Sequence, residues 1–255
     1  GMATNIPPHN LKEVINGLIA LIDRPNLSND KLFDLIPGPD FPTGAEITGT
    51  KGIHDAYRTG RGSIPIRGVA SFEEVKTGKG KRSRQAIIVT ELPYQVNKAS
   101  WITKIASHVN QGRIEGIVDI RYDSFREGMR VVIELKREVQ PHLIFNDLYK
   151  MTPLQTNFGA LMLAIEDVQP KQLSLREILE AFLNFREETL IRQYSYELEQ
   201  KQGRAHIVEG QLIALDNIDD VIDVLRSAPD GTTAKMQMQD QLGLSARQAD
   251  SILTM

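Results

Sequence analysis

SLREILEAFLNFREETLIRQYSYELEQKQGRAHIVEGQLIAL, residues 174–215, is the stretch that decides the fold. Ser174 and Glu177 have the spacing of a capping box, in which each side chain bonds to the backbone N–H of the other residue. No proline follows before Pro229. Apolar residues recur every three or four positions, which is close to the helical repeat. The stretch therefore predicts one helix, roughly 60 Å long at about 1.5 Å per residue.

One face of this expected helix carries an apolar stripe with a single charged member. The stripe consists of Leu190, Tyr194, Leu198, Lys201, Ala205, Val208, Leu212 and Leu215. Gly203 and Gly210 lie within the helix, and each weakens it by roughly 1 kcal/mol relative to alanine, so a bend is compatible with the sequence. Because exposed apolar stripes favour association, we expect self-association or fraying wherever no partner covers this one.

Before residue 173, the pattern predicts an α+β domain with a mostly antiparallel sheet. Asn10 is expected to cap a helix with Val14, Ile15, Leu18, Leu21 and Ile22 on one apolar face. Further helices are expected over 31–36, 97–111 and 142–149, and strands over 63–75, 85–92, 117–122, 129–135 and 156–165. The proline-rich segment 37–44 should be irregular. After the long helix we expect a turn at Asp230-Gly231 and short helices over 219–227 and from Ser245 onward.

The composition is that of an ordinary globular protein, with 255 residues, 41% hydrophobic and 25% charged. No apolar run approaches the roughly 18 residues of a membrane span, and the start lacks the features of a signal peptide. The sequence has no cysteine, so we expect a cytoplasmic location. Its five histidines have no metal-ligand spacing, and no Gly-x-Ser-x-Gly elbow is present. We therefore expect no metal, no cofactor and no complete catalytic site within this chain.

Charge is distributed unevenly, although the net charge is only −3. Residues 51–84 contain nine basic and three acidic side chains, whereas residues 216–255 contain seven aspartates. The densest basic run is KTGKGKRSR, residues 76–84. Phosphates attract such a run, but its composition equally suits a solvated hairpin tip. It contains no aromatic residue for stacking on single strands. It also fails the phosphate-loop pattern, because Arg82 follows Gly80-Lys81.

Asn97 is expected to cap a helix whose first turn contains Lys98. The helix dipole does not favour a cation there, which leaves two interpretations open: an outside anion or plain solvent exposure. The residues expected to contact DNA are Arg61, Lys76, Lys79, Lys81, Arg82, Arg84, Asn97 and Lys98.

Five segments in order resemble the A-type subunit of bacterial type IIA DNA topoisomerases, the family of gyrase and topoisomerase IV. They are GMATNIPPHNL at 1–11, IPGPDFPTGA at 36–45, AYRTGRGS at 56–63, ELPYQVNK at 91–98 and LREILEAFLNFR at 175–186. The resemblance implies four parts: the tail of a winged-helix domain at 1–10, a tower-like α+β domain at 11–172, a long coiled-coil helix at 173–216, and part of a small all-α exit-gate dimerisation domain at 217–255.

The resemblance also implies a reaction, in which paired tyrosines cut one DNA duplex, a second duplex passes, and the break is resealed. Mg²⁺ and ATP are expected on a B-type subunit, and the expected partners are double-stranded DNA, that B-type subunit and another A-type subunit. Arg121-Tyr122 imitates the family's nucleophile dipeptide without its surrounding residues. We therefore expect a piece of a longer protein that lacks the catalytic tyrosine and is inactive alone.

Two other functions fit the same residues. One is a DNA-binding architectural protein without enzymatic activity, built on a basic sheet with a dimerising helix. The other is a coiled-coil scaffold in which the basic hairpin is incidental. Within the family, the resemblance does not separate gyrase from topoisomerase IV, and we favour gyrase.

Overall fold

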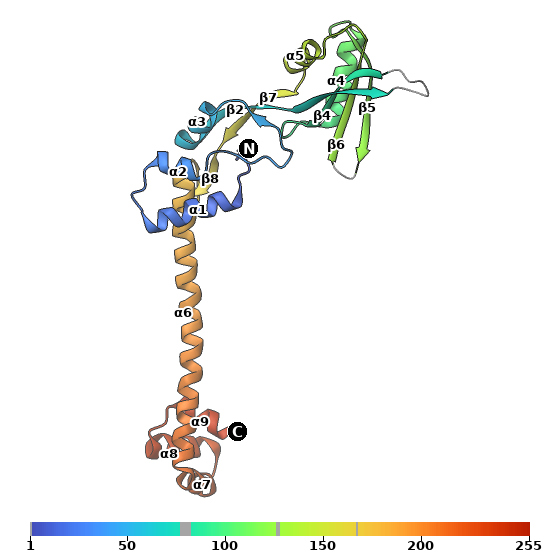
Figure 1. The fold of residues 1–255 in the computed structure, drawn as a ribbon. Coiled ribbons are helices and arrows are strands. Elements are labelled where there is room, and N and C mark those ends of the chain that lie inside the picture. Colours follow the sequence, from blue (N-terminus) through green and yellow to red (C-terminus); the bar gives the residue numbers. More distant parts are fainter. Residues whose placement is uncertain (1, 77–82, 126–127, 167) are drawn as a thin grey trace. The chain divides into compact units, whose positions relative to one another are not determined.

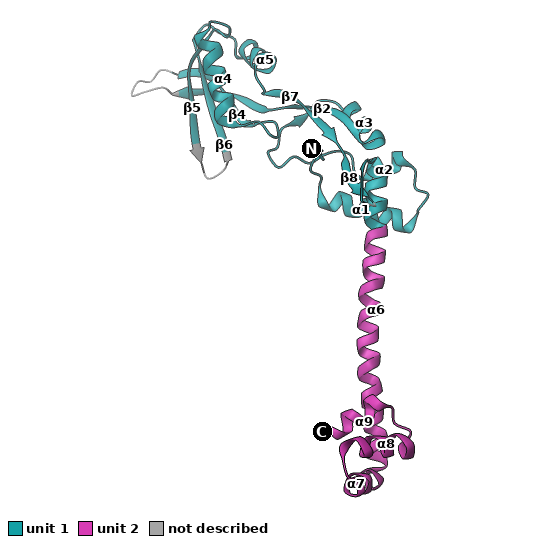
Figure 2. Ribbon diagram, turned by 180° about the vertical axis from the view of Figure 1, so that it is seen from behind, with its two compact units in different colours: residues 1–183 teal, residues 184–255 magenta. Residues whose placement is uncertain are grey.

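The structure, a computed structural model, describes residues 2–76, 83–125, 128–166 and 168–255 (Figure 1). The chain divides into two compact units, residues 1–183 and 184–255 (Figure 2). The boundary falls within α6 (Leu175–Asp216), a helix of 42 residues. The Ser174 amide donates to Glu177 Oε2 at 2.7 Å, and the Glu177 amide donates to Ser174 Oγ at 3.3 Å. The predicted long helix and its capping box are therefore confirmed.

The first unit contains a three-stranded antiparallel sheet in the order β1-β2-β7, formed by β1 (Glu46–Ile47), β2 (Arg61–Arg67) and β7 (Gln155–Leu161). It packs with α1 (Leu11–Asp23), α2 (Asn29–Leu35), α3 (Lys51–Thr59) and the start of α6. Their shared core includes Leu32, Tyr57, Ile64, Phe158 and Leu179. Asn10 caps α1 as predicted, since its side chain accepts from the Lys12 amide at 3.0 Å.

A second antiparallel sheet in the first unit has the order β3-β4-β6-β5. Its strands are β3 (Val69–Lys76), β4 (Ser83–Glu91), β5 (Ile117–Phe125) and β6 (Gly128–Leu135). One face packs against α4 (Lys98–Asn110) and α5 (Pro141–Met151), with Trp101 and Ile133 fully buried between them. A short hairpin of β8 (Leu163–Glu166) and β9 (Gln169–Gln172) precedes α6. The α+β class and the antiparallel sheets are therefore confirmed.

Two expected strands are each divided, which corrects the sequence prediction. The run 63–75 forms β2 and β3 in different sheets, separated by Gly68. The Gly68 amide donates to the Leu154 carbonyl at 2.7 Å, and a Cβ on Gly68 would lie 2.6 Å from Leu154 Cδ1. The run 156–165 is likewise divided at Met162, which is buried and donates to the Gly60 carbonyl at 2.8 Å.

Several local predictions were also incomplete. Helix α3 was not predicted, and Asp230 is the N-cap of α8 (Gly231–Leu242) rather than part of an isolated turn, because its side chain accepts from the Thr233 amide at 2.8 Å. On α1, Ile15 and Ile22 of the predicted apolar face are 44% and 63% exposed. Only part of the expected apolar face of α1 is therefore buried.

The second unit packs the end of α6 against α7 (Ile218–Ser227), α8 and α9 (Ala246–Leu253) around a small core. Ser245 and Gln248 form a capping box, confirming the predicted helix start. Gln248 also donates to the His206 carbonyl of α6 at 2.6 Å. A Cβ on Gly210 would lie 2.5 Å from Gln248 Cγ. Gly210 therefore allows α9 to pack closely against α6, at a position where sequence alone indicated only helix weakening.

The apolar stripe of α6 is largely exposed. Tyr194, Leu198 and Leu212 are 62%, 56% and 55% exposed. The expectation that the stripe is left partly uncovered is confirmed for the chain by itself. Across the described ranges, no helix combines the length and apolar character needed to cross a membrane.

The two glycines of α6 should respond oppositely to alanine. Gly210→Ala places a Cβ against Gln248, and the overpacking should lower the free energy of unfolding by about 1–3 kcal/mol. Gly203→Ala is the matched control, because the nearest atom to its added Cβ lies 3.9 Å away; it should raise the free energy of unfolding by up to about 1 kcal/mol through helix propensity. Urea unfolding followed by circular dichroism measures both, and equal effects would contradict this packing account.

The exposed stripe should make the chain self-associate. Replacing Leu198 and Leu212 together with glutamine removes apolar area that association would bury, so sedimentation velocity should show a smaller associated fraction at equal concentration. Glu199→Gln is the control, because this neighbouring side chain of α6 is exposed but polar. A chain that stays monomeric before any substitution would refute the prediction.

Candidate functional site

The structure places four of the predicted DNA-contacting side chains, and it places them on different elements. Arg61 is exposed on β2 of the three-stranded sheet, whereas Arg84 lies on β4 of the four-stranded sheet. Asn97 and Lys98 are adjacent at the start of α4. The side chain of Lys76 and all of Lys79, Lys81 and Arg82 lie outside the described residues. The described members of this set therefore lie on three elements, β2, β4 and α4.

Lys98 has a partner that sequence reasoning missed. Its Nζ lies 3.4 Å from the centroid of the Tyr122 ring, the geometry of a cation–π contact between α4 and β5. The position of this cation therefore no longer requires an outside anion. Asn97 caps α4 as predicted, because its Oδ1 accepts from the Ser100 amide at 3.0 Å.

Other arginines have interaction partners within the protein, as Arg67 and Arg121 show. The Arg67 guanidinium lies 4.5 Å from the Tyr149 ring centroid and donates to Gln155 Oε1 at 3.0 and 2.8 Å. Arg121 contacts the buried carboxylate of Glu134 at 3.0 Å. Part of the basic character noted in the sequence therefore stabilises the fold.

Three separated segments meet beside the predicted DNA-contacting residues, at the edge of β7. The backbone of Asn5 pairs with Leu161 of β7 through bonds of 2.9 and 3.0 Å. Gln95 donates its side-chain amide to Asn5 Oδ1 at 3.2 Å. The Asp40 amide donates to the Pro8 carbonyl at 2.9 Å. These bonds join residues 1–10, 36–45 and 91–98, although no local sequence signal predicted it. We call the place where the three segments meet the joint.

Glu91 and an aromatic group complete this joint. Glu91 Oε2 accepts from the Ala45 amide at 2.5 Å. The Phe41 ring centroid lies 5.4 Å from that of Tyr94 and 5.3 Å from that of Phe158. The turn after β4 is therefore fastened to the proline-rich segment by both a carboxylate and ring packing.

The partly buried His9 and the buried Tyr57 form a polar pair next to the joint. His9 Nδ1 lies 2.7 Å from the Pro7 carbonyl, which can only accept, so Nδ1 donates and Nε2 accepts from the Tyr57 hydroxyl at 2.7 Å. Burial lowers the pKa of His9, against the opposing effect of the Pro7 bond. Burial, and then the charge of Glu13, raises the pKa of Tyr57. Both groups are therefore held neutral, which makes Tyr57 a poor nucleophile.

The tyrosines of the described residues lie in packed or solvated surroundings. The Tyr149 hydroxyl donates to the Gly68 carbonyl at 3.0 Å, and Tyr94 packs with Phe41 and Phe158. Tyr194 and Tyr196 are exposed on α6. Within the described residues, no cluster of three or more His, Cys, Asp or Glu could hold a metal ion beside any of them.

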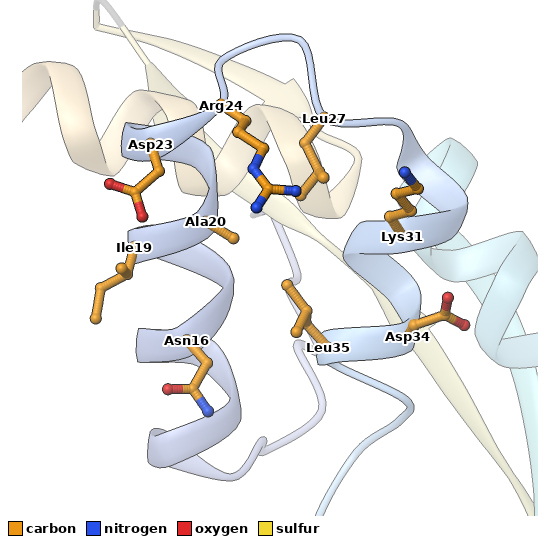
Figure 3. A pocket seen from close by; sticks show the side chains of 9 residues that line it. All are labelled: Asn16, Ile19, Ala20, Asp23, Arg24, Leu27, Lys31, Asp34 and Leu35. Atoms are coloured by element: carbon orange, nitrogen blue, oxygen red, sulfur yellow. The ribbon is translucent and has the colours of Figure 1, made fainter.

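A groove of about 400 Å³ lies between α1 and α2 (Figure 3). It is lined by Asn16, Ile19, Ala20, Asp23, Arg24, Leu27, Lys31, Asp34 and Leu35. In Figure 3, Arg24 extends toward Leu27 across the space between the helices, whereas Asp23 and Asp34 point away from it. Ile19, an exposed apolar residue of α1, borders this groove.

Comparison with known proteins now identifies the family. A family model for the A subunit of DNA gyrase/topoisomerase IV matches residues 1–255. The chain is 58% identical over 257 residues to the DNA topoisomerase 4 A subunit of Synechocystis sp., covering all of this chain and 28% of that relative. It is 53% identical to the DNA gyrase A subunit of the same organism, over all of this chain and 30% of the relative.

The similarity extends to other bacteria. The DNA gyrase A subunit of Pseudomonas aeruginosa is 51% identical over 93% of this chain and 26% of the relative. The chain thus spans less than a third of the length of these relatives. Because the family model matches residues 1–255, the chain belongs to the family of DNA gyrase and topoisomerase IV A subunits.

Proposed function

We propose that this chain is the part of a type IIA topoisomerase A subunit that supports DNA and the exit gate during ATP-dependent double-strand passage. The observation that carries the proposal is the whole-chain match to the family model, together with a relative that is 58% identical over all of this chain. The parent enzyme is a gyrase or a topoisomerase IV. It acts in the cytoplasm on double-stranded DNA.

The four parts of the chain have separate roles in this proposal. Residues 1–10 end a winged-helix domain, and residues 11–172 form a tower-like support whose cations approach DNA phosphates. Residues 173–216 form one helix of a coiled coil, which agrees with the exposed apolar stripe of α6. Residues 217–255 contribute to an exit gate that dimerises with another A-type subunit. The acidic character of this last part would keep it away from DNA.

The chemistry belongs elsewhere in the enzyme. A catalytic tyrosine in another part of the A-type subunit would form the phosphotyrosine bond. The B-type subunit would bind Mg²⁺ and hydrolyse ATP. The neutral His9–Tyr57 pair supports this division, because a tyrosine whose pKa is raised by burial is a weak nucleophile at neutral pH.

Duplex binding by this chain should depend steeply on salt. Replacing Lys79, Lys81, Arg82 and Arg84 with alanine should make the plot of log affinity against log salt less steep, since each phosphate contact contributes about 0.9 to the slope. Fluorescence anisotropy with a random-sequence duplex measures it. The control replaces Lys12, Lys31, Lys201 and Arg226, four exposed cations outside this region. Equal slopes in both variants would remove the hairpin from the DNA contacts.

The chain should not cleave DNA even when the cognate B-type subunit is present. The chemistry requires a tyrosine activated beside a metal ion, and no metal-holding cluster accompanies a tyrosine in the described part of the chain. The chain is mixed with supercoiled plasmid, Mg²⁺, ATP and the B-type subunit, and covalent complexes are trapped with denaturant. A full-length A-type subunit is the positive control. The proposal that this chain lacks the catalytic tyrosine would be disproved by covalent DNA attachment at any of its tyrosines: Tyr57, Tyr94, Tyr122, Tyr149, Tyr194 or Tyr196.

A further inference from the structure

Two residues other than glycine adopt the left-handed backbone region on either side of the joint. Ala45 has φ of 75° and Gln95 has φ of 69°. Residues other than glycine rarely adopt this backbone region, and they remain in it only where surrounding contacts hold them. Ala45 ends the proline-rich segment, and Gln95 lies in the turn between β4 and α4. Both segments are therefore held in conformations that need outside support.

Glu91, the last residue of β4, supplies that support to the first segment. Its carboxylate accepts the Ala45 amide proton at 2.5 Å, and hydrogen bonds to an ionised acceptor are stronger than neutral ones. Gly44, with φ of 70°, allows the approach, because a Cβ there would lie 2.3 Å from Glu91 Oε2. A glycine and a carboxylate therefore act together at this contact.

The same residue begins the turn that leads to the predicted DNA-contacting residues of α4. Leu92 and Pro93 are buried, and the Val96 amide donates to the Pro93 carbonyl at 3.1 Å. Asn97 and Lys98 follow directly. Fixing Glu91 against Ala45 at one end of this turn therefore restricts where α4 can begin.

We propose that Glu91 is a positioning residue for DNA binding, acting through the Ala45 amide to hold the turn that presents Asn97 and Lys98. This rests on the proposed function. The proposal predicts the direction in which DNA affinity changes when Glu91 is replaced, and charge alone predicts the opposite direction. A carboxylate near a polyanion repels it, so removing Glu91 would strengthen binding if only its charge mattered. A positioning role requires that removal weaken binding.

Two variants break the contact, one with and one without loss of the Glu91 charge. Glu91→Ala removes both the contact and the charge, whereas Gly44→Ala keeps the charge and places a Cβ where the carboxylate lies. We expect each to weaken duplex affinity several-fold in fluorescence anisotropy. Glu91→Gln retains an oxygen acceptor for the Ala45 amide and should bind at least as tightly as the original chain. The control, Glu74→Ala, removes an exposed charge from β3 and should not weaken binding.

Hydrogen exchange at the Ala45 amide gives a second readout that does not depend on DNA. Exchange should accelerate in Glu91→Ala and Gly44→Ala and stay slow in Glu91→Gln. Melting temperatures identify variants that fail to fold. If Glu91→Ala or Gly44→Ala fails to fold, the DNA affinity of Glu91→Gln is still compared with that of the original chain. Unchanged or tighter DNA binding by Glu91→Ala, with faster exchange at Ala45, would overturn the positioning role alone. An original chain that binds no duplex would instead overturn the proposed function, and the positioning role with it.

Discussion

A backbone hydrogen bond from the Gly68 amide to the Leu154 carbonyl closes a long insertion within the first unit. The chain leaves the three-stranded sheet after β2 and returns to it at β7, and these two strands pair along residues 61–67 and 155–161. Everything from residue 69 to residue 153 is therefore an insertion between two neighbouring strands. The 2.7 Å bond joins its two ends. Only a glycine fits at residue 68, because a Cβ would meet Leu154 and the Glu91 carbonyl at 2.6 and 2.7 Å.

Three of the family-like segments supply further contacts between the insertion and the rest of the first unit. Residues 1–10, 36–45 and 91–98 converge on the neighbourhood of Glu91, where hydrogen bonds and the Phe41–Tyr94–Phe158 rings join them. The segment 175–186 contributes Leu175 and Leu179 to the adjoining core. Segments 1–10, 36–45 and 91–98, which are separate in the sequence, therefore contact one another at the joint. These contacts hold the inserted four-stranded sheet against the rest of the first unit.

The long helix α6 is packed at its two ends and exposed in its middle. Its first turns pack in the core of the first unit through Leu175 and Leu179, and its last turns pack in the second unit through Ala214. Between them, helical hydrogen bonds maintain it while Tyr194 and Leu198 remain exposed. Helix formation is cooperative once begun, and packing at both ends limits fraying. The exposed middle is the feature that best agrees with a coiled-coil partner.

Local chemistry in the sequence was sufficient to predict the capping box at Ser174, the helix start at Ser245, the caps at Asn10 and Asn97, the long helix and the antiparallel α+β class. These features depend on residues a few positions apart, or on the order of the helical and extended runs along the chain. Only the tertiary structure decided that the strand after Arg61 divides at Gly68, that Ile15 and Ile22 stay exposed, and that Lys98 lies over Tyr122. Each of these depends on a contact, or on the lack of one, between residues distant in sequence, which periodicity and composition do not encode.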